Sequence, residues 1–273
     1  MRGYVDTDWG QIHYRAGGHP VAGASKVIAF YHESPRSSFV YEPVLDSFPE
    51  GVAVLAFDTP GFGQSDSAPA GVPLSEYGRV LIQALDNLGV GEFLPVGMKT
   101  GSSLVVNMAS QLDRSRVPAV VLYNPEAPND EESERWALTW APTLEFPADG
   151  YTLEKLYKKN VGLYGTDNPR VLYEAVAETI INADRYNSIY PTVFRAHTQT
   201  WNDMHDLIAG GTDVTIFRPS SGQMTPDDPI EFADIEGTKV VAFDVTGQFP
   251  ALAHDAFVEA VEVAAGLPVP AAS

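Results

Sequence analysis

The sequence predicts an α/β fold in which an eight-stranded, mostly parallel sheet has helices on both faces. Three observations support this prediction: short apolar runs alternate with amphipathic stretches, the central runs are apolar at almost every position, and the alternation breaks off mid-chain and later resumes. Continuously apolar runs are typical of strands buried on both faces of a parallel sheet. Repeated strand–helix alternation implies right-handed crossovers between parallel strands.

Eight short segments are expected to be strands. The first two form a hairpin closed by Trp9 and Gly10. Residues 26–31 (KVIAFY) and 52–57 (VAVLAF) are nearly continuous apolar runs bounded by turn residues, as expected of central strands. In chain order, the expected strands are residues 4–8, 11–15, 26–31, 52–57, 92–96, 119–123, 213–217 and 239–243.

Amphipathic stretches between these strands are expected to be helices, because their apolar residues recur at the spacing of one helix face. Gly89 ends one of them, as glycine commonly does after a helix. The expected helical stretches are residues 39–48, 74–88, 100–112, 153–157, 171–181 and 252–265.

The strand–helix alternation stops after the sixth expected strand and resumes at the seventh. The intervening segment has helical stretches and no strand-like apolar run, and it is far longer than an ordinary connection. We therefore expect residues 1–124 and 210–273 to form an α/β core and residues 125–209 to form a helical cap over it.

The composition excludes several classes of function. The 273 residues are 44% hydrophobic, which is enough for a sizeable core, and 17 basic against 36 acidic residues give a net charge of −19. Such a surface repels nucleic acid and anionic lipid. The absence of cysteine excludes disulfides and thiol chemistry. No apolar run reaches the about 18 residues of a membrane span, and no secretory signal is visible, so we expect a cytoplasmic protein.

Neither a cofactor nor a metal is expected. Gly61–Asp66 lacks the third glycine of a dinucleotide-binding fingerprint, and no helix is expected to follow it directly. His197 and His205 lie eight residues apart without the pattern of a zinc-binding helix. The expected partner is therefore a small-molecule substrate, and the sequence leaves the oligomeric state open, a homodimer included.

Three motifs at the ends of expected strands resemble those of the α/β-hydrolase superfamily. They are His32–Ser38 (HESPRSS), Phe57–Asp66 (FDTPGFGQSD) and Gly97–Gly101 (GMKTG). That family writes His-Gly-x-Pro-x-Ser-Ser, Asp-x-x-Gly-x-Gly-x-Ser-Asp and, at the nucleophile elbow, Gly-x-Ser-x-Gly. The order and spacing resemble the capped branch that includes epoxide hydrolases, haloalkane dehalogenases and C–C hydrolases, over nearly the whole chain.

All three positions of the catalytic triad depart from the family pattern. Lys99 stands where the nucleophile belongs, and Gln248 stands where the resemblance places the histidine. No carboxylate follows the seventh expected strand, where Ser221 is nearest, and the alternative acid position holds Asn124 with Glu126 two residues on. A Ser-His-Asp acyl transfer is therefore excluded, and we expect little activity on activated esters.

Lys99 and Glu33 are the candidate catalytic residues. Glu33 replaces the glycine beside the oxyanion-hole loop, and the motifs bring it to the same pocket floor as Lys99. A helix N-terminus and burial under a cap disfavour a cation, so we expect Lys99 to act as a neutral amine or a Schiff-base former, with Glu33 exchanging its proton. The resemblance implies oxyanion-hole donors at the backbone N–H groups of Ser34 and Thr100.

The remaining pocket candidates are His32, Trp136, Trp140 and His197. The two tryptophans lie four residues apart at helical spacing, which fits either packing within the cap or a wall of the substrate site. His197 is a candidate surrogate base, although a surface position is favoured. Asp58 is expected to be structural, holding the turn after its strand.

The leading functional hypothesis is a cofactor-independent enzyme that acts on a small, mostly apolar carbonyl compound. C–C cleavage, decarboxylation or proton transfer would use Lys99 with Glu33. One alternative is a hydrolase that positions a water with Lys99, Glu33 and Gln248. A second alternative is a catalytically inactive ligand-binding protein, which a fully ion-paired Lys99 would favour, whereas an intact oxyanion hole would favour an enzyme.

Overall fold

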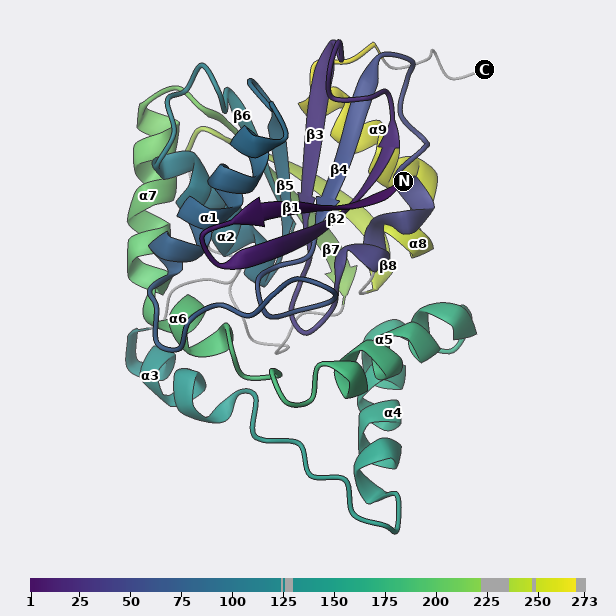
Figure 1. Cartoon of the computed structure of the whole chain (residues 1–273). Coiled ribbons are helices and arrows are strands. Elements are labelled where there is room, and N and C mark those ends of the chain that lie inside the picture. Colours follow the sequence, from purple (N-terminus) through teal and green to yellow (C-terminus); the bar gives the residue numbers. More distant parts are fainter. Residues whose placement is uncertain (124, 126–129, 222–235, 247–248, 269–273) are drawn as a thin grey trace.

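The structure, a computed structural model, describes residues 1–123, 125, 130–221, 236–246 and 249–268. Its centre is an eight-stranded sheet in the order β1-β2-β4-β3-β5-β6-β7-β8, and the antiparallel pairs β1–β2 and β2–β4 are the exceptions to parallel pairing (Figure 1). This confirms the predicted architecture. The strands are β1 (Arg2–Thr7), β2 (Gly10–Gly18), β3 (Lys26–Tyr31), β4 (Val52–Phe57), β5 (Leu94–Met98), β6 (Ala119–Tyr123), β7 (Asp213–Ser221) and β8 (Thr238–Thr246).

The helices follow the expected stretches with local differences. Residues 39–48 form only a short 3₁₀ helix, because Pro43 lies inside it and has no N–H to donate. The expected helix at 252–265 is divided at Ala253, which is not helical. The helices are η1 (Ser38–Val44), α1 (Leu74–Asn87), α2 (Thr100–Ser110), α3 (Asp130–Thr139), α4 (Tyr151–Tyr164), α5 (Pro169–Ile181), α6 (Tyr190–Arg195), α7 (His197–Ala209), α8 (Phe249–Leu252) and α9 (His254–Ala264).

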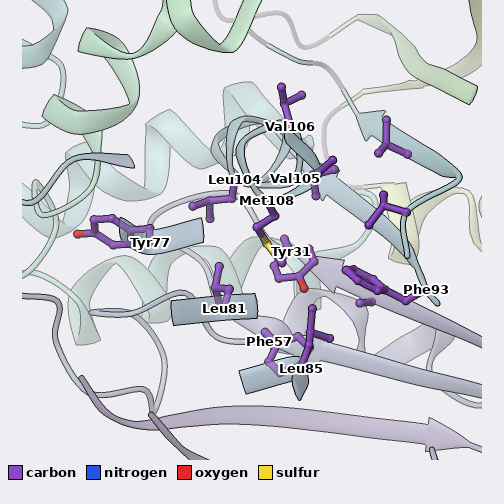
Figure 2. Close-up of a cluster of buried hydrophobic side chains, with 14 of the residues drawn as sticks. Tyr31, Phe57, Tyr77, Leu81, Leu85, Phe93, Leu104, Val105, Val106 and Met108 are labelled. Carbon is purple, nitrogen blue, oxygen red and sulfur yellow. The ribbon is translucent and has the colours of Figure 1, made fainter. Parts of the chain in front are cut away.

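Both faces of the sheet are buried, which explains the continuous apolar runs. Alternate residues of β3 point to opposite sides: Tyr31 joins a cluster with α1 and α2, whereas Phe30 joins a cluster with η1 and α9. Figure 2 shows the first cluster, in which Tyr31 lies near Leu81 of α1 and Met108 of α2. Each such large side chain contributes roughly 1.5–3 kcal/mol by leaving water.

Between β6 and β7 the described residues form the helices α3 to α7 and no strand. α4 and α5 project away from the sheet, whereas α7 lies beside α2 (Figure 1). Met204 of α7 is fully buried in the same cluster as Leu104 of α2. The last helix of the expected cap segment therefore packs on the core. None of the helices among the described residues combines the length and apolar character needed to cross a membrane.

Asp58 fixes the turn after β4. Its carboxylate accepts hydrogen bonds from the backbone N–H groups of Ser38 at 2.6 Å and Gln64 at 2.8 Å, and it lies 2.8 Å from Nδ1 of His13. A Cβ at Gly63 would lie 2.1 Å from this carboxylate, so only glycine fits there. The contacts agree with the expected structural role of Asp58.

We expect Asp58→Asn to lower the free energy of unfolding at pH 7 by about 2–4 kcal/mol. Burial raises the pKa of Asp58, but the hydrogen bonds from His13, Ser38 and Gln64 outweigh it and hold this pKa below its ordinary value. A group with a lowered pKa in the folded state stabilises the fold above about pH 4, and this contribution is lost as the pH falls.

Urea unfolding at pH 7 and pH 3.5 checks this expectation. The difference between wild type and Asp58→Asn should narrow at the lower pH, because the carboxylate of the unfolded wild type then binds a proton that the folded protein resists. Asp66→Asn, at an exposed position in the same motif, is the matched control. An equal difference at both pH values would contradict the assigned role.

Candidate active site

Lys99 occupies a sharp turn between β5 and α2. It has φ 49° and ψ −111°, and it is the only non-glycine residue with positive φ among those the structure describes. Its neighbours explain the turn: a Cβ at Gly97 would lie 2.3 Å from the carbonyl oxygen of Gly101, and a Cβ at Gly101 would lie 2.2 Å from that of Tyr31. Strained backbone of this kind costs about 1–3 kcal/mol and is characteristic of functional sites.

The structure brings Lys99 and Glu33 together as a buried ion pair. Nζ of Lys99 lies 2.7 Å from Oε2 of Glu33, and the two side chains are 10% and 6% exposed. A carboxylate at this distance stabilises an ammonium, so the geometry favours a charged pair over the expected neutral amine. The physical reason is that Glu33 opposes the effects of the helix N-terminus and of burial.

Tyr164 of α4 completes this cluster. Its hydroxyl donates a hydrogen bond of 3.1 Å to Oε1 of Glu33. Burial, together with the charge of Glu33, raises the pKa of Tyr164 to about 12, so the phenol keeps its proton and remains a donor. Glu33 is thus held between a cation on one oxygen and a phenol on the other.

A cavity of about 310 Å³ opens above this cluster. Glu33, Lys99 and Thr100 form part of its lining, and residues of α4, α5 and α6 form much of the rest. A larger groove of about 760 Å³ lies between residues 67–74 and α6, but Lys99, Glu33 and Tyr164 do not line it. We therefore place the candidate active site at the smaller cavity, which lies at the low end of the usual range for ligand pockets.

The expected oxyanion hole is not open in this structure. The backbone N–H of Ser34 donates to Oγ1 of Thr100 at 2.8 Å, and the Thr100 hydroxyl lies 3.3 Å from Oγ of Ser34. The expectation that the Ser34 N–H is available is therefore wrong for this arrangement. The motif position alone did not reveal that a threonine hydroxyl would fill the space. The Thr100 N–H begins α2, where no intrahelical acceptor exists.

His32 is a structural residue and not a pocket residue. Its Nε2 accepts the N–H of Thr59 at 2.9 Å, so its proton is on Nδ1, which lies 2.8 Å from the carbonyl oxygen of Glu33. Burial lowers the pKa of His32, which keeps the imidazole neutral. Both nitrogens are used in joining two loops, and His32 is absent from the cavity lining.

The aromatic candidates separate into one wall residue and two packing residues. Trp140 lines the cavity, whereas Trp136 and His197 do not. The rings of Trp136 and His197 lie 5.6 Å and 5.2 Å from the ring of Phe194. His197 is only 3% exposed, so the favoured surface position was wrong; it is buried because the rings of Phe194 and Trp136 pack against it.

The other candidates lie where the structure gives no geometry for them. Asn124, Glu126 and Gln248 are outside the described residues, and Ser221 is described only as the end of β7, paired with Thr246 of β8. In the described part of the chain, no three or more metal-ligating side chains gather as a metal site.

Sequence reasoning missed a second buried ion pair at the cavity. Nε of Arg36 and Oγ of Ser37 both donate to the carboxylate of Glu178 on α5. Arg36 lines the cavity and is 2% exposed. Arg36 lies inside the HESPRSS motif, but Glu178 follows it by 142 residues, and no local pattern marked it.

Comparison with known proteins agrees with this fold. Residues 30–165 match the family model of the alpha/beta hydrolase fold. These residues include the end of β3, the segment with Glu33 that follows it, β5 and the turn at Lys99. The chain has the alpha/beta hydrolase fold.

Particular relatives are similar over part of the sequence or over the fold. Haloalkane dehalogenase 2 of Mycobacterium tuberculosis is 30% identical over 123 residues, which are 44% of this chain and 41% of that protein. The match thus spans about two fifths of the length of this relative. The enol-lactonase of Burkholderia xenovorans LB400 superposes with a TM-score of 0.73 at 19% identity, covering 95% of this chain and 98% of that one. A thermophilic esterase of Thermogutta terrifontis gives 0.69 at 17% identity, covering 96% and 97%.

Proposed function

We propose that the chain is an enzyme that transfers a proton at a carbon next to a carbonyl group, using Glu33 as the base and Lys99 as the cation that holds the carbonyl oxygen. The observation that carries the proposal is the buried pair at 2.7 Å, which lines a cavity of about 310 Å³ and whose Lys99 lies on a strained turn. A base beside a fixed cation is what enolate formation requires.

The chemistry follows from the two charges. The carboxylate of Glu33 takes the proton, the electrons of the C–H bond move to the carbonyl oxygen, and the ammonium of Lys99 stabilises the resulting negative charge. Return of the proton from Glu33 to the same or a neighbouring carbon restores both residues. C–C cleavage and decarboxylation pass through the same kind of enolate, so the geometry supports all three reactions of the leading hypothesis.

Tyr164 has an orienting role in this scheme. It keeps its proton, and its hydrogen bond holds one oxygen of Glu33 while the other oxygen faces Lys99. Since Tyr164 belongs to α4, the orientation of the base depends on the helical insertion. The alternative that activates a water also needs Gln248, which lies outside the described residues.

A ligand-binding protein without catalysis is the second candidate. Two observations favour it: Lys99 is ion-paired, and the Ser34 N–H is bonded to Thr100. A protein of this kind would hold a ligand in the cavity without exchanging its protons. A measurement of proton exchange on bound ligands separates the two candidates.

Exchange in deuterated water provides that measurement. Small ketones and 1,3-dicarbonyl compounds are incubated with the protein, and loss of the C–H signal is followed by proton NMR. We expect the wild type to accelerate exchange for at least one of them, and Glu33→Gln to reduce this acceleration by at least about 100-fold. Glu50→Gln, at an exposed position, is the control. Calorimetric binding of these compounds without exchange would establish the binding protein instead.

A further inference from the structure

The candidate cavity is positively charged in a strongly acidic protein. Arg36, Lys99 and Lys159 line it, and Glu33 is the one carboxylate among its described lining residues. The whole chain has a net charge of −19. Three cations at one cavity are therefore a local departure from the charge of the molecule. Glu33 pairs with Lys99 and Glu178 pairs with Arg36, which leaves the charge of Lys159 in excess.

Arg36 has unused hydrogen-bonding capacity. Its Nε donates to Glu178, but its Nη1 is buried and has no hydrogen-bond acceptor among the described residues. A buried guanidinium N–H without an acceptor is unfavourable, and a ligand oxygen would remove that cost. The planar guanidinium is suited to the two oxygens of a carboxylate.

Lys159 is the lining cation for which the described residues provide no carboxylate partner. Its Nζ lies 3.3 Å from the hydroxyl of Tyr186, which is a neutral group. Tyr164 lies between the anion-binding side and the catalytic pair: its ring is 5.8 Å from Cζ of Arg36, and its hydroxyl contacts Glu33. The ring of Tyr164 thus separates Arg36 from the pair of Lys99 and Glu33.

We infer that the cavity binds a carboxylate group through Arg36 and Lys159, so that the substrate is a small oxo-acid. The carboxylate provides affinity and orientation, and the carbonyl group reaches Lys99. The assignment of the carbonyl rests on the proposed function, whereas the anion site rests on Arg36 and Lys159 alone. This replaces the expectation of a mostly apolar substrate with a more specific one.

Calorimetric titration with two matched probes tests the inference. The probes are 4-oxo-4-phenylbutanoate and its neutral amide, which differ only in the anionic group. We expect the wild type to bind the acid at least about tenfold more tightly than the amide. This ratio should fall at least threefold in Lys159→Met and in the double variant Arg36→Gln/Glu178→Gln, which removes both charges of the buried pair together. Lys158→Met, an exposed position of α4, should keep the wild-type ratio.

Equal affinity of the wild type for acid and amide would overturn the inference, and so would an unchanged ratio in both variants. A fall in one variant alone supports the anion site and assigns it to that residue. If the double variant does not fold, as judged by circular dichroism, the acid-to-amide affinity ratios of the wild type and of Lys159→Met decide whether the anion site exists. Because binding needs no turnover, a preserved ratio without proton exchange would remove the proposed function and leave the anion site.

Discussion

Lys99→Met is expected to lower the rate of proton exchange at least about 100-fold, because the enolate oxygen then has no cation beside it. The same change leaves the buried Glu33 without its cation, which should lower the free energy of unfolding by about 3–5 kcal/mol. In the double variant Lys99→Met/Glu33→Gln, both charges are gone, and most of that stability should return. Urea unfolding and the NMR exchange assay measure the two effects.

The form in which Lys99 acts is decided by a second substitution. If Lys99 acts as a cation, Lys99→Arg keeps the charge and should retain measurable exchange. If it acts as a neutral amine or forms a Schiff base, Lys99→Arg should be inactive, and borohydride with substrate should fix a mass adduct on the wild type. The charged pair favours the first result. Full exchange in Lys99→Met would refute any role of this side chain.

Gly101→Ala is expected to prevent the chain from folding stably, with a loss of at least about 4 kcal/mol. The added Cβ would lie 2.2 Å from the carbonyl oxygen of Tyr31 and 2.9 Å from that of His32. Both are backbone atoms at the end of β3, so they cannot move aside as a flexible side chain would. This clash could be relieved only if α2 moved away from the sheet.

Gly162→Ala is the matched control for this prediction. Gly162 lies in α4, and a Cβ there would meet no atom within 4 Å. The substitution should therefore stabilise the protein by about 0.5–1 kcal/mol, because alanine is the better helix former. Soluble yield and urea unfolding measure the change in stability of Gly101→Ala and of Gly162→Ala. Wild-type stability of Gly101→Ala would mean that the elbow does not pack this closely on β3.

The secondary structure could largely be predicted because it depends on local patterns. The runs at 26–31 and 52–57 are apolar at nearly every position, and they form β3 and β4 over those same residues. Element boundaries were less accurate. β5 begins two residues later than expected and extends to Met98, and η1 is short because of Pro43.

The candidate site could be predicted only as far as its motifs extend. Gly97–Gly101 and His32–Ser38 follow neighbouring parallel strands, so their placement indicated that Lys99 and Glu33 share one edge of the sheet. The motifs did not indicate that Thr100 would take the N–H of Ser34, because that contact depends on side-chain rotamers.

The sequence by itself determined the α/β architecture, the strained elbow and the presence of a lysine where the family has a nucleophile. The tertiary structure alone decided the environment of that lysine. Tyr164 contacts Glu33 across 131 residues of sequence, and Glu178 contacts Arg36 across 142. Periodicity and motifs report on neighbours in the chain, whereas these contacts depend on how α4 and α5 pack over the loop after β3. The charge balance of the cavity, and with it the expected substrate, follows from that packing.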